Sequence, residues 1–218
     1  MKPPAPWPHR GLYLITPDEA DTDRLLERVR PALAAGPALL QYRNKAAGDP
    51  LRREQARELL ALCRSAGLPL VINDDWRLAA ELGADGAHLG GDDGSLAEAR
   101  AALGPDALLG SSCYEQIDRA ERAAADGASY LAFGAFFASG TKPGARRADP
   151  ALLAASARLG LPRVAIGGIT PDNAGIVIAA GAGMVAVIGG VFDSADPAAS
   201  VRAYRRCFNL PSLSNPPA

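Results

Sequence analysis

Residues that could bind an anion follow the second of eight short apolar runs in the sequence. Residues 41–45 read QYRNK. Side chains alternate along an extended chain, so Gln41, Arg43 and Lys45 should lie on one side. Two cations and an amide on one side could bind a diphosphate. The alternative is that Arg43 and Lys45 are solvated loop charges, although an arginine on the inner face of a barrel strand needs an anionic partner.

Carboxylates follow the next two apolar runs. The run at residues 69–73 leads into Asp74 and Asp75, and Asp93 comes shortly after the run that follows it. Carboxylates at the ends of adjacent strands can share one hard cation. Mg²⁺ takes one or two carboxylates together with substrate phosphate oxygens and water. The alternative for Asp75 and Asp93 is that each of them caps a helix.

Zinc chemistry and histidine catalysis are not indicated. The chain has two histidines and no HExxH motif, so we do not expect a zinc site. His88 lies inside an apolar run, so we expect a hydrogen-bonded core residue rather than a catalyst.

Glycine pairs and a basic segment add further anion-binding signals. Residues 139–147 read SGTKPGARR. Small and basic residues there predict a loop that folds over an anion and excludes water, and the alternative is a solvated surface loop. Gly167-Gly168 and Gly189-Gly190 end the last two apolar runs. Glycines at such ends let backbone N–H groups approach a phosphate.

The eight apolar runs predict buried parallel strands. Each is about five residues long and nearly continuous in its hydrophobicity, as in a sheet covered on both faces. They lie at residues 11–16, 38–43, 69–73, 86–90, 107–111, 130–134, 163–167 and 184–188.

Segments with helical spacing separate these runs. They lie at residues 24–33, 53–66, 77–82, 96–103, 116–126, 150–159, 172–180 and 198–207. Four of them should begin at an N-cap followed by proline, at Asp49, Asp149, Thr170 and Asp196. Glycines should end most of them, at positions 36, 67, 83, 104, 127, 160 and 181. Eight such units predict an α/β fold, a single closed (β/α)₈ TIM barrel, with an open doubly wound sheet as the alternative.

Length and composition set the remaining bounds. The 218 residues suit one domain of this type, and we expect the barrel at residues 10–208 between a proline-rich tail at 1–9 and a second tail at 209–218. The formal charge of −1 gives no global field that would attract nucleic acid or an anionic membrane. The start lacks the apolar core of a signal peptide, and no apolar stretch is long enough for a membrane helix. Three cysteines without a CxxC pair indicate a reduced, cytoplasmic protein, and a homo-oligomer is compatible with these features.

Seven motifs in order resemble the thiamine-phosphate synthase family. They run through nearly the whole chain and are QYRNK (41–45), IND (72–74), HLGGDD (88–93), LLGSS (108–112), FGAFFASGTK (133–142), VAIGGI (164–169) and VAVIGG (185–190). Each motif alone is a weak signal, and seven in order are a strong one.

The resemblance implies an enzyme, a transferase that condenses an aminopyrimidine diphosphate with a thiazole phosphate, with Mg²⁺ as its cofactor and these two small molecules as its partners. The pyrimidine diphosphate would be bound by Gln41, Tyr42, Arg43, Asn44, Lys45, Asn73, Ser112 and Lys142. Among these, the residues assigned to catalysis would be Arg43, Lys45, Ser112 and Lys142. The thiazole phosphate would be bound by Ser139, Gly140, Thr141, Gly168, Ile188 and Gly189. Asp74 and Asp93 would hold the magnesium ion. The implied chemistry is dissociative: pyrophosphate leaves, and the thiazole nitrogen attacks the resulting cation.

Some positions depart from the family pattern. Gly91 stands where glutamine is usual, Tyr114 where histidine is common, Ala138 where proline is common and Gly189 where serine is typical, while Ser139 replaces a threonine conservatively. Gly91 puts a side-chain contact near the metal in doubt, and Gly189 removes a hydroxyl from the thiazole-phosphate site.

Three other functions compete with this interpretation. A related thiazole tautomerase would share the fold but use no diphosphate substrate, and the set Arg43, Lys45, Asp74, Asp93 and Lys142 argues against it. A sugar-phosphate epimerase or isomerase would need an acid–base pair across the barrel, which we do not find. A barrel that only binds thiamine precursors would be distinguished by the absence of turnover.

Overall fold

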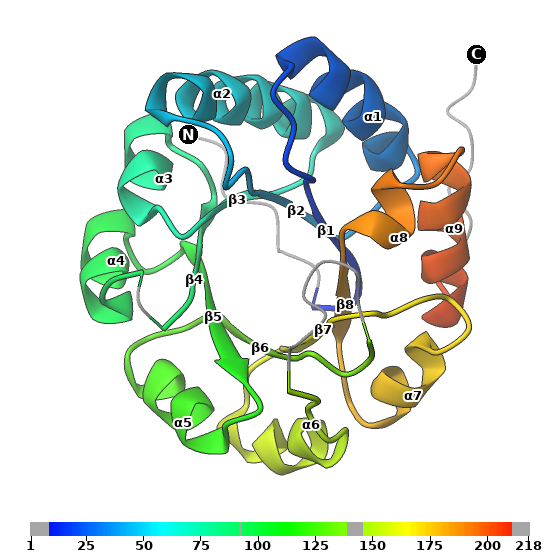
Figure 1. Ribbon diagram of the computed structural model, residues 1–218. Helices are drawn as coiled ribbons and strands as arrows, with labels where there is room; N and C mark the ends of the chain where they lie inside the picture. Colours follow the sequence, from blue (N-terminus) through cyan, green and yellow to red (C-terminus); the bar gives the residue numbers. More distant parts are fainter. Residues whose placement is uncertain (1–8, 92, 139–145, 211–218) are drawn as a thin grey trace.

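The chain forms a closed barrel of eight parallel strands surrounded by helices (Figure 1). The computed structural model describes residues 9–91, 93–138 and 146–210. Strand β1 (Gly11–Ile15) pairs with β8 (Met184–Val187), with Gly11 opposite Met184, and this pairing closes the ring. The prediction of a TIM barrel is therefore confirmed, and the open sheet is excluded.

The remaining strands follow one another around the barrel in chain order. They are β2 (Leu39–Tyr42), β3 (Leu70–Asn73), β4 (Gly86–Leu89), β5 (Leu108–Tyr114), β6 (Tyr130–Gly134) and β7 (Arg163–Ile166). All eight predicted strands occur within a few residues of their expected bounds. The largest difference is β5, which continues past Ser111 to Tyr114 with a shift of register between Ser112 and Tyr114. Such irregularities bend a strand and often redirect side chains beside an active site.

Helices cover the outside of the barrel, as Figure 1 shows. They are α1 (Thr22–Ala34), α2 (Asp49–Ala66), α3 (Trp76–Leu82), α4 (Leu96–Leu103), α5 (Ile117–Ala125), α6 (Ala151–Ala155), α7 (Ala174–Ala179), α8 (Gly189–Phe192) and α9 (Pro197–Cys207). The helix expected at residues 150–159 divides into α6 and the 3₁₀ turn Ser156–Leu159. The short helix α8 was not predicted, because four residues beginning with two glycines have no helical period to detect.

The glycines predicted at the helix ends are confirmed, but of the four predicted N-caps only one is confirmed. The seven glycines expected after helices all have positive φ, from 66° at Gly83 to 108° at Gly181. Asp196 caps α9 as expected, and its side chain accepts a hydrogen bond from the amide of Ala199. The other three expected N-caps are wrong, because the actual caps are Gly48 for α2, Pro150 for α6 and Asn173 for α7. Proline fits either of the first two helical positions, so the Asp-Pro pair alone does not locate a boundary.

Two layers of apolar packing support the barrel. Alternate strand residues such as Leu14, Leu40 and Leu109 pack outward against the helices, in a layer that also contains helix residues such as Leu59. The others fill the interior, and this inner layer includes two fully buried tyrosines, Tyr13 and Tyr130. A buried tyrosine needs a partner for its hydroxyl group, so the interior must also contain polar contacts.

All three thiols are free, with Cys63 and Cys113 buried and Cys207 partly exposed. Among the described residues no helix combines the length and the apolar character that crossing a membrane requires. The two tails predicted at residues 1–9 and 209–218 lie almost entirely outside the described residues.

Candidate active site

The last two side chains of strand β2 point to opposite faces of the barrel sheet. Gln41 points into the barrel interior, where its amide nitrogen donates a 2.6 Å hydrogen bond to the hydroxyl of Tyr13. Tyr42 points outward, and its hydroxyl donates to Oε1 of Gln55 on α2 at 2.9 Å. The alternation of an extended strand causes this separation. Gln41 is thus directed toward the interior, whereas the side chain of Tyr42 is committed to the layer between strand and helix.

Asn44 shapes the loop after β2. Its side-chain nitrogen donates to the carbonyl oxygen of Glu19 at 2.6 Å and to Gln55 at 3.0 Å, and its oxygen accepts from the amides of Ala46 and Ala47, both at 3.2 Å. Only 6% of the residue is exposed. The side chain of Asn44 is therefore saturated by protein contacts, so any contact with a ligand would come from the backbone of this loop.

Asp18 positions both cations of the QYRNK segment. Its Oδ1 accepts a 2.9 Å hydrogen bond from the guanidinium of Arg43 and a 2.8 Å hydrogen bond from the backbone amide of Lys45. The backbone of Arg43 is also held by the hydroxyl of Thr16, through two bonds of 2.8 Å. Asp18 was not among the predicted site residues. Its position shortly after β1 is the sequence signal that could have indicated it.

The two carboxylates predicted to hold a metal ion and the amino group of Lys45 come together at the ends of β2, β3 and β4. The Nζ atom of Lys45 lies 3.0 Å from Oδ2 of Asp74. The amide of Asp74 donates to the carbonyl oxygen of His88 at 2.8 Å, which aligns the end of β3 with β4. Asp74 has a positive φ of 63°, an unusual conformation for a residue other than glycine and one that occurs often at functional sites.

Asp93 lies against Asp74 and retains a proton more strongly than an isolated carboxyl group. Partial burial, and next to it a hydrogen bond with the carboxyl of Asp74, raise the pKa of Asp93. Its Oδ2 also accepts a 2.7 Å hydrogen bond from the amide of Gly90. Two carboxylates this close repel each other unless a proton or a cation lies between them. The donor set therefore fits a magnesium ion, which needs only one or two protein carboxylates.

The capping alternative holds for one carboxylate and fails for the other. Asp75 caps α3, because its Oδ1 accepts from the amide of Leu78 at 2.9 Å. Helix α4 is capped by Ser95 and not by Asp93. Asp93 is thus left for the pair with Asp74. No group of three or more acidic, histidine or cysteine side chains suited to a metal occurs within the described ranges.

Ser112 lies on β5, and its hydroxyl is 3.0 Å from Nε2 of His88. The other ring nitrogen of His88, Nδ1, is 3.1 Å from the hydroxyl of Tyr130. Burial lowers the pKa of His88 to about 4. The histidine is therefore neutral near pH 7 and hydrogen-bonded inside the barrel, as expected from the apolar run that contains it.

The ends of β7 and β8 offer backbone N–H groups, rather than side chains, as possible contacts for a phosphate. Gly168 has a φ of 60°, and a Cβ atom there would lie 2.8 Å from the carbonyl oxygen of Phe137, so only glycine fits. On the neighbouring strand, Ile188 and Gly189 lead into α8. The first turn of a helix leaves its N–H groups without helical acceptors. The predicted phosphate-binding backbone of Gly168, Ile188 and Gly189 is thus gathered at two adjacent strand ends.

Comparison with known proteins identifies the family. The family model for thiamine monophosphate synthase matches residues 12–191. A thiamine-phosphate synthase of Azoarcus sp. (strain BH72) is 60% identical over 201 residues, which are 91% of this chain and 97% of the relative. One from Xylella fastidiosa (strain 9a5c) is 54% identical over 92% of this chain and 86% of the relative. The chain belongs to the thiamine monophosphate synthase family.

Solved structures agree with this membership. The thiamine phosphate pyrophosphorylase from Pyrococcus furiosus superposes with a TM-score of 0.81 at 29% identity, covering 93% of this chain and 96% of that one. A 3-hexulose-6-phosphate synthase has a TM-score of 0.66 at 21% identity, covering 90% of this chain and 99% of that one, and this likeness shows the fold alone. The expectation of an enzyme of the transferase class is confirmed with the family.

Two departures from the family pattern have structural counterparts. A Cβ atom at Gly91 would overlap the guanidinium of Arg119, so Arg119 lies in the space that a larger residue would occupy. A Cβ atom at Gly189 would overlap the carboxylate of Asp193. Both neighbours are the far ends of flexible side chains and can move. Tyr114, a third departure, is 41% exposed, and Arg119 lies over its ring, 5.2 Å from the centroid.

Four predicted site residues of the family lie outside the described residues. They are Ser139, Gly140, Thr141 and Lys142, and their roles stay predictions. Of the others, the structure gathers Lys45, Asp74 and Asp93 into one cluster, and Arg43 joins it through the Asp18 contacts.

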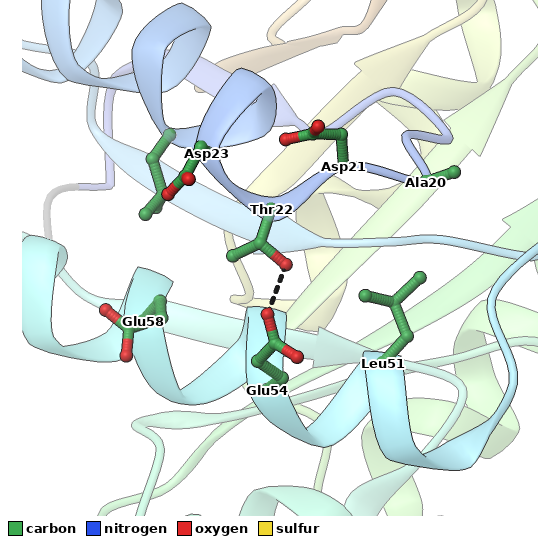
Figure 2. Close-up of a pocket in the computed structure, with 8 residues that line it drawn as sticks. Ala20, Asp21, Thr22, Asp23, Leu51, Glu54 and Glu58 are labelled. Carbon is green, nitrogen blue, oxygen red and sulfur yellow. Dashed lines mark hydrogen bonds between the residues drawn. The ribbon is translucent and has the colours of Figure 1, made fainter.

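A hollow between α1 and α2 lies outside the barrel and shares no lining residue with this cluster. Figure 2 shows acidic side chains around it, with the hydroxyl of Thr22 donating to Glu54 at 2.6 Å. Its lining also includes Asp21, Asp23 and Glu58. An anionic substrate would be repelled there, so the hollow does not compete with the strand ends as the binding site for a phosphate.

Proposed function

We propose that this chain is a thiamine-phosphate synthase that joins an aminopyrimidine diphosphate to a thiazole phosphate and releases pyrophosphate. The observation that carries the proposal is the cluster of Lys45, Asp74 and Asp93 at neighbouring strand ends. A cation beside a pair of carboxylates suits a diphosphate together with a divalent ion. A site for a monophosphate alone would need only the cation or the glycine backbone.

The pyrimidine diphosphate would lie over the ends of β2 to β5. Arg43 and Lys45 would contact its phosphates, with Lys142 as a further cation, and Gln41, Asn73 and Ser112 would contact its polar atoms. Tyr42 and Asn44 would take part only through the backbone of the loop, because their side chains are held by Gln55 and Glu19. Asp18 would act indirectly, since it fixes both the guanidinium of Arg43 and the backbone of Lys45.

Asp74 and Asp93 would hold Mg²⁺, whose charge would neutralise the departing pyrophosphate. The raised pKa of Asp93 supports this assignment, because the pair already favours a positive partner between its oxygens. Lys45 would orient Asp74 through their 3.0 Å contact. The assignment uses the two carboxylates and leaves the remaining positions of the ion to phosphate oxygens and water.

The thiazole phosphate would lie across the barrel mouth, at the ends of β7 and β8. The backbone N–H groups of Gly168, Ile188 and Gly189 would donate to it, and Ser139, Gly140 and Thr141 would complete the site. The methyl compound and its carboxylated form both carry the phosphate that this backbone would bind.

The reaction would need positioning more than acid–base catalysis. The bond between the methylene carbon and the diphosphate oxygen would break, and the lone pair of the thiazole nitrogen would form the new carbon–nitrogen bond. Arg43, Lys45 and Lys142 would stabilise the negative charge of the leaving group. Holding both substrates in line would supply much of the remaining acceleration.

Incubation of the purified protein with each precursor alone and with both together tests the proposal. We expect a thiazolium product only when both are present. Conversion of the thiazole phosphate alone, with the pyrimidine diphosphate left unused, would instead identify an isomerase. Binding of both precursors without any conversion would identify a binding protein.

A further inference from the structure

A continuous chain of hydrogen bonds crosses the barrel interior from β2 to β5. Gln41 contacts Tyr13 at 2.6 Å, the hydroxyls of Tyr13 and Tyr130 are 2.8 Å apart, and Tyr130 contacts His88 at 3.1 Å. His88 in turn contacts Ser112 at 3.0 Å. The five residues belong to β2, β1, β6, β4 and β5, and β1 and β6 lie on different sides of the ring in Figure 1.

The side chains of this hydrogen-bonded chain are part of the buried core. Tyr13 and Tyr130 are at most 1% exposed, and their rings meet edge to face with centroids 5.9 Å apart. The imidazole of His88 stacks on Tyr130 at 5.6 Å. Gly110 makes room for this stack, because a Cβ atom there would overlap both Tyr130 and His88. The middle of the chain is thus enclosed, and its two ends are Gln41 and Ser112.

One arrangement of the hydrogens satisfies all four contacts in a single direction. The amide nitrogen of Gln41 can only donate, so the hydroxyl of Tyr13 accepts from it, and in this arrangement Tyr13 gives its own hydrogen to Tyr130. Tyr130 then gives its hydrogen to Nδ1 of His88. The ring of His88 is buried and accepts this hydrogen bond at Nδ1, so it carries one hydrogen. That hydrogen must lie on Nε2, which donates to Ser112.

We propose that Tyr13, Tyr130 and His88 are positioning residues that fix which hydrogen-bonding groups Gln41 and Ser112 present to the pyrimidine substrate. With its nitrogen used by Tyr13, Gln41 presents its oxygen as an acceptor. With its oxygen used by His88, Ser112 presents its hydrogen as a donor. An aminopyrimidine offers the complement, an N–H donor next to a ring-nitrogen acceptor. This positioning role rests on the proposed function, whereas the direction of the hydrogen bonds does not.

The direction can be measured without turnover by ¹⁵N NMR of the histidine rings. The chain has two histidines, so ¹⁵N-histidine labelling gives two rings to assign, and His9→Gln identifies the signals of His88. We expect the hydrogen of His88 on Nε2 in the unsubstituted protein. A hydrogen on Nδ1 would overturn the proposed direction, whether or not the protein makes product.

Gln41→Glu should reverse the direction of the hydrogen bonds, starting from the end opposite Ser112. An ionised carboxylate can only accept, so Tyr13 would donate to it, Tyr130 would donate to Tyr13, and the hydrogen of His88 would move to Nδ1. The spectrum is recorded at pH 9 to ionise the new carboxyl group. Gln116→Glu, the same change at the exposed N-cap of α5, which is not part of the hydrogen-bonded chain, should leave the ring unchanged. An unchanged tautomer in a folded Gln41→Glu protein at pH 9 would show that the two ends are not coupled.

Tyr130→Phe tests the consequence for the substrate and remains informative if Gln41→Glu fails to fold. It keeps the ring and removes the link, so we expect a mixture of His88 tautomers and a 3- to 10-fold loss of kcat/KM for the pyrimidine diphosphate, on the order of one hydrogen bond. The KM for the thiazole phosphate should not change. Tyr204→Phe is the matched control, because it also removes a buried hydroxyl, which donates to Ile169 at 2.8 Å outside the chain.

The two failures are distinguishable. A reversed His88 tautomer in Gln41→Glu would support the coupling through the hydrogen bonds even if the unsubstituted protein showed no synthase turnover. That combination of results would reject only the proposed function. Normal turnover with an unchanged pyrimidine kcat/KM in Tyr130→Phe, or an equal loss for both substrates, would reject the positioning role.

Discussion

Lys45 and Asp74 form an ion pair, with 3.0 Å between Nζ and Oδ2, that joins the end of β2 to the end of β3. The contact connects a residue expected to bind diphosphate with one expected to bind metal. Lys45 is 58% exposed and Asp74 29% exposed at the side chain. A surface pair of this kind contributes little to stability. We therefore expect the ion pair to position the two side chains for a ligand that contacts both.

Replacing Lys45 should impair use of the pyrimidine diphosphate. Lys45→Met removes a charge-assisted contact that is worth roughly 1.5–3 kcal/mol, so we expect kcat/KM to fall about 10- to 150-fold. Steady-state kinetics at saturating thiazole phosphate measures this. Arg53→Met is the control, since Arg53 pairs with Glu81 on the helices outside the barrel. Equal kinetics for the two variants would make Lys45 a solvated charge.

Asp74→Asn and Asp93→Asn should each raise the magnesium concentration needed for half-maximal turnover. Each change keeps the size of the side chain and removes a charge that the ion requires. A second readout is the melting temperature, which Mg²⁺ should raise in the unsubstituted protein by binding to the folded state. Asp75→Asn is a matched control, because asparagine also caps helices and should preserve the response to magnesium. Unaltered magnesium dependence in both variants would remove Asp74 and Asp93 from the metal site.

Lys142→Ala should lower turnover more than it weakens binding of the thiazole phosphate. The residue lies outside the described part of the chain, and its role is expected from the family motif. Loss of one charge-assisted contact to the leaving pyrophosphate predicts about a 10- to 150-fold effect. Single-turnover rates and equilibrium binding of the thiazole phosphate separate the two quantities. Normal turnover would make Lys142 a surface charge.

The buried His88 should make the fold less stable in acid. Burial lowers its pKa in the folded protein from 6.5 to about 4. Below pH 6.5 the unfolded chain takes up a proton that the folded chain does not, so stability falls as the pH drops from 6.5 to 4. The full effect is on the order of 3 kcal/mol. Urea unfolding at several pH values, compared with His88→Gln, isolates this contribution, and parallel pH profiles for the two proteins would exclude it.

Gly189→Ser should restore a hydroxyl donor at the end of β8. The new Cβ atom would displace the carboxylate of Asp193, which is 76% exposed and pairs with Arg28 at 3.9 Å, a surface contact worth little, so we expect little change in stability. A hydrogen bond to a phosphate should lower the KM for the thiazole phosphate about 10-fold. Gly175→Ser on α7, where the added atom meets no neighbour, is the control. A raised KM in Gly189→Ser would show that this space is needed empty.

The fold was predictable because its signals are repeated. Eight apolar runs and seven glycines with positive φ specify strands and helix ends many times over, so an error at one boundary does not change the topology. The exact starts of α2, α6 and α7 were not predictable, since several residues near each start can satisfy the first N–H groups. The four residues of α8 carry too little sequence for any period to show.

The site was predictable as a set of strand ends but not in its internal contacts. Alternation along β2 separates Gln41 from Tyr42, yet the hydrogen bonds of Asn44 depend on the loop that contains Glu19 and on Gln55 of α2. The chain through Tyr13, Tyr130 and His88 joins non-adjacent strands through the interior. Contacts of this kind arise from the closure of the barrel, which no local pattern encodes.

The most direct test of the central claim is the stoichiometry and metal dependence of one reaction. Purified protein is incubated with the aminopyrimidine diphosphate and the thiazole phosphate, and thiamine phosphate and pyrophosphate are both quantified, with Mg²⁺ and with excess EDTA. We predict equimolar formation of the two products with magnesium and loss of both with EDTA. A folded protein that forms no thiamine phosphate from the two precursors in the presence of magnesium would contradict the proposed synthase, and undiminished formation in EDTA would contradict the role of Asp74 and Asp93.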